Sequence, residues 1–418
     1  MTLRSGLCLA LIAWLGLPAS SSAQPVPPRQ ALAFPVVTRS GKALECVIAC
    51  GPNAPVAALA FSPDGKLLAT GGYQEVLVWD LAGGKLLRRV GVGGLNDLVH
   101  ALAYHKDGHL LAVGEGSPGG SGAVKVYNVD TGALAIQFQE PKDVVYALAF
   151  SPDGKWLAGG GADATLRVWS MDGKTGPATL KEHSDWVQGV AFSPDGKFLA
   201  SAGADRAALV WEVGTWKRLA RIEKKDPVMG VAFSPDSQLV LLAVAGEEDR
   251  VLHLHKRDGG DPVRTTDLGT AAPTDVVWFP QPRPNRVVVP CTDKGLRVYD
   301  GSDGNYLVRL AGHTGWVYRA AVSPDGKIVA SASADGTTRL WAIAGGRHLA
   351  TLVQITPRTD EWLIATAQGY LATSTPGALR WKATGLTTPP EGLSRLLLKP
   401  EYVQQSIAGK PVPPPDPS

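Results

Sequence analysis

The sequence predicts an all-β protein whose repeats form a ring of eight four-stranded blades, the architecture called a β-propeller. The first observation is a turn sequence, Phe-Ser-Pro-Asp-Gly, that returns along the chain in full or weakened form. Its copies begin at Phe61, Tyr104, Phe150, Phe192, Phe233, Phe279, Val322 and Ala365. The second observation is their spacing of 41 to 46 residues, because a fixed period of this length indicates a repeat architecture.

The turn sequence explains two strands of each repeat. Proline presets the second position of a type I turn, aspartate accepts local backbone bonds and glycine takes the left-handed position that follows. Apolar alternation on both sides, as in residues 187–192 and 198–200, predicts a hairpin. A third strand ends on an aromatic residue, and a fourth follows a glycine-rich turn such as Gly83-Gly84. Four short antiparallel strands make one propeller blade. The third-strand aromatics are Trp79, Tyr127, Trp169, Trp211, Tyr299, Trp341 and Trp381, with Leu254 as the exception.

The chain begins with a pattern typical of a secretory signal peptide. Arg4 gives a positive start, residues 7–17 are apolar, and Ser21 and Ala23 fit the small positions before a cleavage site. Residues 1–23 are therefore expected to be removed, leaving an exported chain, periplasmic or secreted, that starts at Gln24. No other long apolar run follows, so no transmembrane segment is expected in the mature chain.

The remaining chain divides into three parts. Residues 24–40 are expected to form a lead-in linker, residues 41–385 the propeller, and residues 386–418 a C-terminal tail. Within the tail, Pro400 to Ile407 is predicted to form a short helix, since proline is favoured in a first helical turn. The last residues, 410–418, are rich in proline and are expected to be extended and solvated.

The number of blades depends on how the two ends of the repeat region are joined. Residues 360–384 form a degenerate eighth copy with three strands and no fourth, whereas residues 42–47 resemble a fourth strand without the first three. Pairing residues 42–47 with residues 378–382 would close an eight-bladed ring and remove the exposed strand edges. The alternative is seven blades with a C-terminal extension, because the seventh repeat has its own fourth strand at residues 348–353.

Composition limits the classes of function. The mature chain has 40 basic and 38 acidic residues once Arg4 is removed, which argues against a dedicated nucleic-acid surface. Its cysteines, Cys46, Cys50 and Cys291, are odd in number and predict buried apolar side chains rather than a disulfide framework. His253 and His255 share a strand face without a third ligand nearby, and residues 300–305 lack the glutamate of a calcium loop. No metal and no cofactor is expected.

The sequence resembles the WD-repeat family, in the form of a bacterial-type exported member. Trp79-Asp80 is the dipeptide that gives the family its name, and the resemblance covers residues 41–384. Two repeats carry the family's fuller residue set, which the resemblance implies is a hydrogen-bonded network inside a blade. The first, second and sixth repeats lack the Gly-His element of this set and the fifth lacks the tryptophan, so those blades are expected to be less rigid. The two sets are His183, Ser201, Asp205 and Trp211, and His313, Ser331, Asp335 and Trp341.

These tetrads are interpreted as structural and not as hydrolytic triads. A buried indole N–H needs a hydrogen-bond acceptor, and serine, histidine and aspartate can form a chain of hydrogen bonds that begins with that acceptor. The resemblance places binding residues elsewhere, at the start of each first strand beside the top of the central channel. Side chains there vary between blades, whereas the apolar positions two residues later are nearly uniform. We call the varied set the channel rim: His100, Tyr146, Trp186, Gln188, Met229, Asp275, Trp316, Tyr318 and Arg319.

Two functions are consistent with this pattern. The first is a non-enzymatic scaffold, acting as a monomer, that presents the rim to a protein or peptide partner, since Trp, Tyr, Met and Arg are enriched at interfaces. The second is a propeller enzyme or cofactor carrier with ligands lining the channel. Asp275 and His100 are the only ionisable rim positions apart from Arg319, so the sequence favours the scaffold and predicts no catalytic residues.

Overall fold

The computed structural model describes residues 30–37, 43–50, 55–138, 140–247, 249–280, 285–376, 379–383 and 397–415, the segments 30–37, 43–50 and 379–383 by their backbone alone. The predicted signal peptide and the residues between these segments lie outside the described part. Within it, no helix combines the length and the apolar character needed to cross a membrane.

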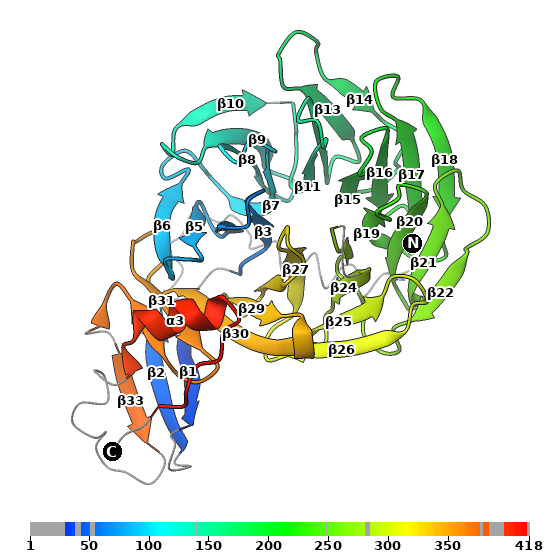
Figure 1. Ribbon diagram of the computed structural model, residues 1–418. Helices are drawn as coiled ribbons and strands as arrows, with labels where there is room; N and C mark the ends of the chain where they lie inside the picture. Colours follow the sequence, from blue (N-terminus) through cyan, green and yellow to red (C-terminus); the bar gives the residue numbers. More distant parts are fainter. Residues whose placement is uncertain are drawn as a thin grey trace.

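Seven antiparallel sheets surround a common axis and confirm the predicted propeller (Figure 1). Each blade is a meander of strands consecutive in the chain. Blades 1 to 3 contain β3 (Ala58–Phe61), β4 (Leu67–Gly71), β5 (Val76–Asp80), β6 (Lys85–Val90); β7 (Leu98–Tyr104), β8 (Leu110–Ser117), β9 (Ser121–Asn128), β10 (Leu134–Phe138); β11 (Val145–Phe150), β12 (Trp156–Gly161), β13 (Leu166–Ser170) and β14 (Ala178–Leu180). Blades 4 to 6 contain β15 (Val187–Phe192), β16 (Phe198–Gly203), β17 (Ala207–Glu212), β18 (Arg218–Glu223); β19 (Val228–Phe233), β20 (Leu239–Ala245), β21 (Arg250–Lys256), β22 (Arg264–Asp267); β23 (Val277–Trp278), β24 (Arg286–Pro290), β25 (Gly295–Asp300) and β26 (Tyr306–Ala311).

The repeated turn forms as its chemistry predicts. In blade 1 the Ser62 hydroxyl donates to the Asp64 carboxylate at 2.6 Å and accepts the Leu67 N–H at 2.9 Å. Gly65 closes the turn with an N–H bond of 2.9 Å to the Ser62 carbonyl and has a φ of 71°, a conformation that favours glycine. The same serine–aspartate bond recurs at Ser151, Ser193, Ser234 and Ser323.

The core lies between neighbouring blades. Trp211 of blade 4 packs with Leu199 of its own blade and with Leu166 and Val168 of blade 3. Each blade covers an apolar face of the next, so burial is shared around the ring. Trp79, Trp211 and Trp341 are among the largest side chains that are almost fully buried.

Seven blades form the ring, so the prediction of eight is wrong and its alternative is correct. Blade 7 contains β27 (Val317–Val322), β28 (Ile328–Ser333), β29 (Thr338–Ala342) and β30 (Arg347–Gln354), with the 3-10 helix η1 (Ala344–Gly346) before β30. Its inner strand lies beside β3, and the Val56 N–H donates to the Ser333 carbonyl at 3.1 Å. The degenerate eighth copy supplies β31 (Trp362–Thr366) and β32 (Leu371–Thr373), which extend blade 7 outward into a six-stranded sheet.

The strands expected to close the ring do pair, but they do so outside it. Strand β2 (Ala43–Cys50) lies antiparallel to β33 (Leu379–Ala383), with Cys46 opposite Trp381. Strand β1 (Gln30–Val37) adds to the other edge of β2, so part of the stretch expected as a linker is a strand. The resulting three-stranded sheet projects from the propeller beside blade 7 (Figure 1). Ring closure fails because β30 already supplies the fourth strand of blade 7 and β3 meets β27 directly.

The C-terminal segment covers the junction of blades 7 and 1. Helix α3 (Pro400–Ile407) forms at the residues where the sequence predicts a helix. Its Val403 and Ile407 belong to the core cluster that blades 1 and 7 share. The Ser406 hydroxyl donates to the Leu349 carbonyl of blade 7 at 2.8 Å, and the Gln404 amide donates to the Gly83 carbonyl of blade 1 at 3.0 Å. Beyond the helix, Pro415 is buried, so the described part of the proline-rich tail is not fully solvated as expected.

Candidate binding face and central channel

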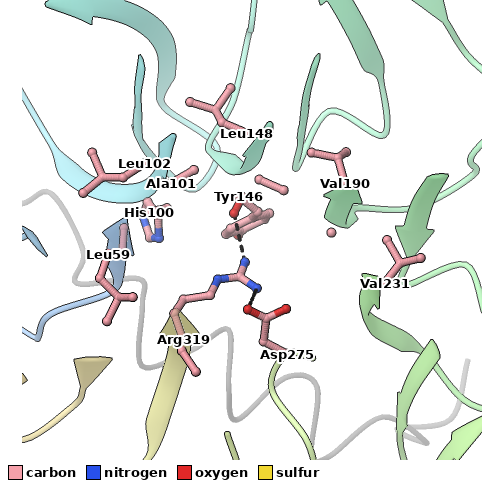
Figure 2. Close-up of a pocket in the computed structure, with 14 residues that line it drawn as sticks. Leu59, His100, Ala101, Leu102, Tyr146, Leu148, Val190, Val231, Asp275 and Arg319 are labelled. Carbon is pink, nitrogen blue, oxygen red and sulfur yellow. Dashed lines mark hydrogen bonds and ion pairs between the residues drawn. The ribbon is translucent and has the colours of Figure 1, made fainter. Parts of the chain in front are cut away.

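Arg319 of β27 reaches across the channel and ties four blades together (Figure 2). Its Nη2 donates to the Tyr146 carbonyl of blade 3 at 2.9 Å and to the Gln188 carbonyl of blade 4 at 3.2 Å. Its Nη1 lies 3.4 Å from Oδ2 of Asp275, just before the first strand of blade 6. The side chains of Arg319 and Asp275 keep exposed fractions of 20% and 16%, so solvent reaches the pair.

A cavity of about 120 Å³ surrounds this cross-link. His100, Tyr146, Asp275 and Arg319 supply its polar groups, and the rest of the lining consists of glycine and apolar residues of the first strands. Four of the nine channel-rim residues therefore meet in one space. Burial raises the pKa of Asp275, while the nearby Arg319 guanidinium and the Val276 N–H oppose that shift.

His100 and Tyr146 are buried at this cavity, with exposed fractions of 4% and 5%, and their rings meet edge to face at 5.5 Å. Burial lowers the pKa of His100 to about 4, which keeps the imidazole neutral at physiological pH. Nε2 of His100 and the hydroxyl of Tyr146 have no hydrogen-bond partner among the described residues. Burial likewise raises the pKa of Tyr146, so its hydroxyl stays protonated and can donate to a ligand.

The other rim residues are less exposed than the sequence analysis expects. Met229 and Tyr318 are buried, at 5% and 7%, and Met229 packs with two alanines of blades 5 and 6. First strands converge on the axis, so side chains at their starts lie against neighbouring blades. Trp186, Gln188 and Trp316 are half-buried, and the Trp186 ring lies 5.8 Å from that of Tyr146. The two tryptophans are thus the aromatic rim residues that remain accessible.

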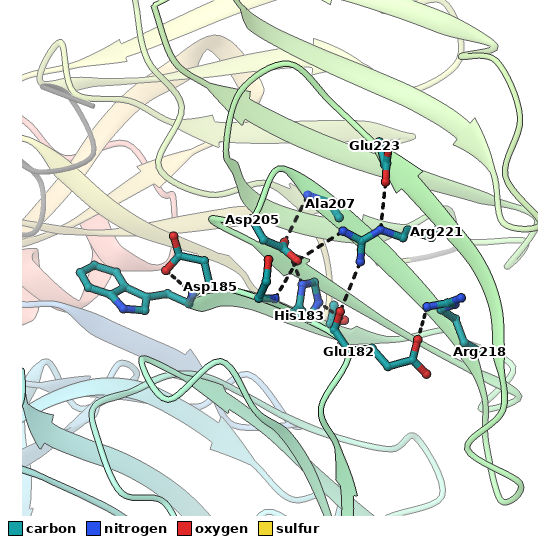
Figure 3. Close-up of polar contacts among 11 residues, drawn as sticks. Glu182, His183, Asp185, Asp205, Ala207, Arg218, Arg221 and Glu223 are labelled. Atoms are coloured by element: carbon teal, nitrogen blue, oxygen red, sulfur yellow. Dashed lines mark hydrogen bonds and ion pairs between the residues drawn. The ribbon is translucent and has the colours of Figure 1, made fainter. Parts of the chain in front are cut away.

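The first predicted tetrad forms a continuous hydrogen-bonded chain, and Figure 3 shows two of its members, His183 and Asp205, with the charged residues around them. Nδ1 of His183 lies 2.9 Å from the Asp205 carboxylate, and its Nε2 lies 2.8 Å from the Ser201 hydroxyl. The Trp211 indole N–H donates to that same hydroxyl at 3.2 Å. Arg221 extends the network with a contact of 3.6 Å to Asp205. All four tetrad side chains are buried in the blade interior, and Ser201 has no exposed surface.

The second tetrad repeats this geometry in blade 7. Nδ1 of His313 lies 2.9 Å from Asp335, its Nε2 lies 2.7 Å from the Ser331 hydroxyl, and Trp341 donates to Ser331 at 2.9 Å. Burial raises the pKa of Asp335, but hydrogen bonds and charge from His313 outweigh it, so the pKa is held well below its usual range. The carboxylate is therefore ionised throughout the physiological range.

Blades without the tetrad use other polar networks, which the sequence analysis missed. In blade 2 the Lys125 ammonium pairs with the Glu115 carboxylate, both at least 95% buried. Glu115 also accepts the N–H groups of Asn96 at 2.6 Å and Asp97 at 3.1 Å. In blade 1 the Trp79 indole donates to Thr70 at 3.0 Å, a threonine standing where the tetrads have serine. The sequence signal for the pair in blade 2 was an acidic residue on β8 and a basic residue on β9, each standing among apolar residues.

The structure offers no evidence of a metal site in its described part. Within the described residues, no group of three or more histidines, cysteines, aspartates and glutamates is placed to hold a metal ion. His253 and His255 lie on one face of β21 with ring centres 6.0 Å apart. Cys291 is a free, buried thiol whose pKa burial raises to about 12, whereas the side chains of Cys46 and Cys50 lie outside the described set.

Parts of the sequence match a known family model and several known proteins. Residues 44–80, 133–170, 176–212 and 304–342 match the family model described as WD domain, G-beta repeat. The small ribosomal subunit protein RACK1y of Oryza sativa subsp. japonica is 36% identical over 74 residues, which cover 18% of this chain and 22% of that protein. The small ribosomal subunit protein RACK1 of Caenorhabditis elegans is 35% identical over 88 residues, or 21% and 27% of the two chains. The cross-pathway control WD-repeat protein 2 of Flammulina velutipes is 39% identical over 69 residues, or 16% and 22%.

These alignments span between 22% and 27% of each relative, and all three relatives are eukaryotic. The bacterial-type exported origin therefore stays a prediction. Four matched repeats and a ring of seven blades together support the assignment of this chain to the WD-repeat family of β-propellers.

Proposed function

We propose that this protein is a non-enzymatic scaffold that binds a protein or peptide on the upper face, the end of the channel where the first strands begin. The observation that carries the proposal is the pair of half-buried tryptophans, Trp186 and Trp316, beside a channel whose interior is fixed by Arg319. Aromatic anchors on a rigid support lose little conformational entropy on binding. WD-repeat propellers are generally interaction scaffolds, which agrees with this assignment.

The structure shifts the expected anchors within the rim. Of the rim residues whose types are enriched at interfaces, Tyr146, Met229 and Tyr318 are buried, and Arg319 already bonds to other blades. We infer that these residues shape the floor of the site, and that Trp186 and Trp316 make the larger direct contacts. Nε2 of His100 and the hydroxyl of Tyr146 remain available to a polar group that enters the channel.

The proposed location is outside the cytoplasm. It rests on the signal-like sequence of residues 1–23, from Arg4 through the apolar run to Ala23. N-terminal sequencing of the protein from its native host should begin at Gln24. A cytoplasmic protein that retains Met1 would overturn this part of the proposal.

The competing function, an enzyme or cofactor carrier, requires ionisable side chains that converge on the channel. His100 and Asp275 line one cavity, but Asp275 faces Arg319 rather than an open metal or substrate position. A metal or chromophore that co-purifies in equal molar amount with the protein would favour that function over the scaffold.

The experiment is affinity capture with the chain starting at Gln24, from an extract of the native host. A partner should be enriched by the unaltered protein and lost by the double variant Trp186→Ala, Trp316→Ala. The matched control is Trp216→Ala, because Trp216 is also half-buried but lies in the turn between β17 and β18, at the opposite end of its blade. Equal capture by the double variant and the control would contradict the proposed face.

A further inference from the structure

A second cavity, of about 470 Å³, lies at the other end of the channel, where the first strands of blades 4, 5 and 6 end in their turns. We call it the lower cavity. Phe192, Phe233 and Phe279, the aromatics that open the three turns, line it together with Trp278. Prolines of the same turns complete the wall. Phe233 and Phe279 belong to the packed core, with exposed fractions of 5% and 1%, so the half-buried Phe192 and Trp278 are the aromatic side chains that a ligand could contact.

Blade 6 differs from its neighbours in the strand and the turn beside the lower cavity. Strand β23 has only two residues, Val277 and Trp278, whereas β15 and β19 have six each. Pro280 follows Phe279 directly, at the position where five of the other six blades carry the serine whose hydroxyl closes the turn. Because proline has no N–H, the turn of blade 6 lacks the bond that the Ser193 N–H makes to the Phe198 carbonyl in blade 4, and pairing in β23 begins only at Val277.

The polar lining of the lower cavity is confined to its inner end. Among the described residues that line it, Asp275 alone is ionisable. Its Oδ1 accepts the Val276 N–H at 2.8 Å and its Oδ2 faces Arg319 at 3.4 Å, so the carboxylate charge is balanced by the guanidinium. The Trp278 indole N–H donates to Asn285 at 2.8 Å and is not free for a ligand. The cavity therefore offers a hydrogen-bond acceptor without a net charge.

We propose that the lower cavity binds a small, uncharged aromatic molecule with one hydrogen-bond donor, of the phenol or indole type. Its volume falls within the range of about 300–1,000 Å³ typical of small-molecule sites, which are mostly apolar with a few placed polar groups. Aromatic walls favour an aromatic ligand through offset and edge-to-face contacts. The donor would bond to the remaining lone pairs of Asp275, whereas an anion would lose its hydration without finding a free hydrogen-bond donor among the described side chains that line the cavity. This site opens at the other end of the channel from the proposed upper face, and it shares Val190, Val231 and Asp275 with the upper cavity around Arg319.

Three naphthalene compounds test the proposal on the unaltered protein, by isothermal titration. 1-Naphthol carries the aromatic body and the donor, 1-methoxynaphthalene lacks the donor, and 1-naphthoate is an anion. We expect 1-naphthol to bind about tenfold more tightly than 1-methoxynaphthalene, a difference of roughly 1.4 kcal/mol, and 1-naphthoate to bind most weakly. Equal affinity for the three compounds, or no measurable binding of 1-naphthol, would overturn the proposal.

Variants locate the site. Trp278→Ala should weaken 1-naphthol binding at least about tenfold, because a cavity wall is lost, while Tyr306→Ala should leave it unchanged. Tyr306 is an exposed aromatic residue on the outer strand of the same blade, so it controls for nonspecific adsorption. Asp275→Asn should reduce the preference of 1-naphthol over 1-methoxynaphthalene. An equal loss in Trp278→Ala and Tyr306→Ala, with both variants folded by circular dichroism, would place the binding elsewhere.

Discussion

His100 gives the sharpest test at the scale of single residues. Its imidazole is buried as the neutral form, and its pKa falls from 6.5 to about 4, first through burial and then through the charge of Arg319. The unfolded chain therefore takes up this proton at higher pH than the folded protein does. Stability from this group is present above pH 6.5 and is lost as the pH falls toward 4.

The measurement compares the free energy of unfolding at pH 7 and pH 4.5 in the unaltered protein and in His100→Gln. His348 and His253, whose pKa values also fall to about 4, contribute equally to both proteins and cancel in the comparison. The decrease on acidification should be smaller in the variant, by up to roughly 3 kcal/mol. Identical pH dependence in the two proteins would mean that His100 is solvated.

The tetrad tryptophans give a second residue-level prediction. Trp211→Ala and Trp341→Ala should each lower the free energy of unfolding by about 3–5 kcal/mol, because each removes a large buried side chain and a bond to serine. Chemical denaturation measures the loss, and Trp216→Ala, a half-buried tryptophan, is the control. Unchanged unfolding midpoints in both tetrad variants would show that these side chains are not part of the packed core.

The sequence allowed the tetrads to be placed at this scale but not the burial of the rim. A buried indole N–H needs an acceptor, so serine, histidine, aspartate and tryptophan at fixed positions in a repeat predict one hydrogen-bonded arrangement. Tyr146 and Met229, by contrast, stand at strand starts, where exposure depends on how closely neighbouring blades approach. The distance between neighbouring blades is set by closure of the ring, so a local sequence pattern does not predict it.

At the scale of the blade, the buried Glu115–Lys125 pair shows that blade 2 replaces the tetrad rather than lacking a polar network. Lys125→Met should cost about 3–5 kcal/mol, because it leaves the Glu115 carboxylate buried without its counter-charge. Thermal unfolding with the surface control Lys155→Met, expected to change stability by at most about 1 kcal/mol, measures the difference. A loss in Lys125→Met no larger than in the control would mean that the pair is solvated.

The strand pattern of a blade could be predicted because its causes are local. The proline–aspartate–glycine turn and the alternation beside it determine the hairpins, and β27 to β29 lie where that pattern places them. The expectation that blades without the Gly-His element are less rigid overlooked pairs such as Glu75 with Arg89, 2.8 Å apart in blade 1. These pairs join residues of different strands, and they become evident only once the register is known.

At the scale of the whole molecule, none of the described strands is shared between the first and last blades, so other contacts must hold the ring closed. The Arg358 N–H donates to Glu75 of blade 1 at 2.8 Å, and the Trp79 and Trp362 rings meet at 6.5 Å. Helix α3 adds bonds to both blades. The segment after β30 thus holds blades 1 and 7 together, and we call it the clasp. The number of strands alone could not distinguish this arrangement from an eighth blade.

Removal of the helix tests the clasp. A chain that ends at Lys399 should lose several kcal/mol of stability, since each buried apolar side chain such as Val403 and Ile407 contributes roughly 1.5–3 kcal/mol. Hydrogen exchange should accelerate in β3 and β27, on the two sides of the junction, more than in β15 of blade 4. Acceleration confined to β31 and β32 would show that the helix protects only its own neighbours.

The account's central claim is that the upper face binds the partner. Hydrogen exchange of the complex with the captured partner measures this most directly. We predict slower exchange at residues 181–188 and 312–319, the approaches to Trp186 and Trp316, and no change in the turns at residues 62–66 and 193–197. Protection of those turns or of the outer strands, with the approaches to the two tryptophans unaffected, would contradict the claim.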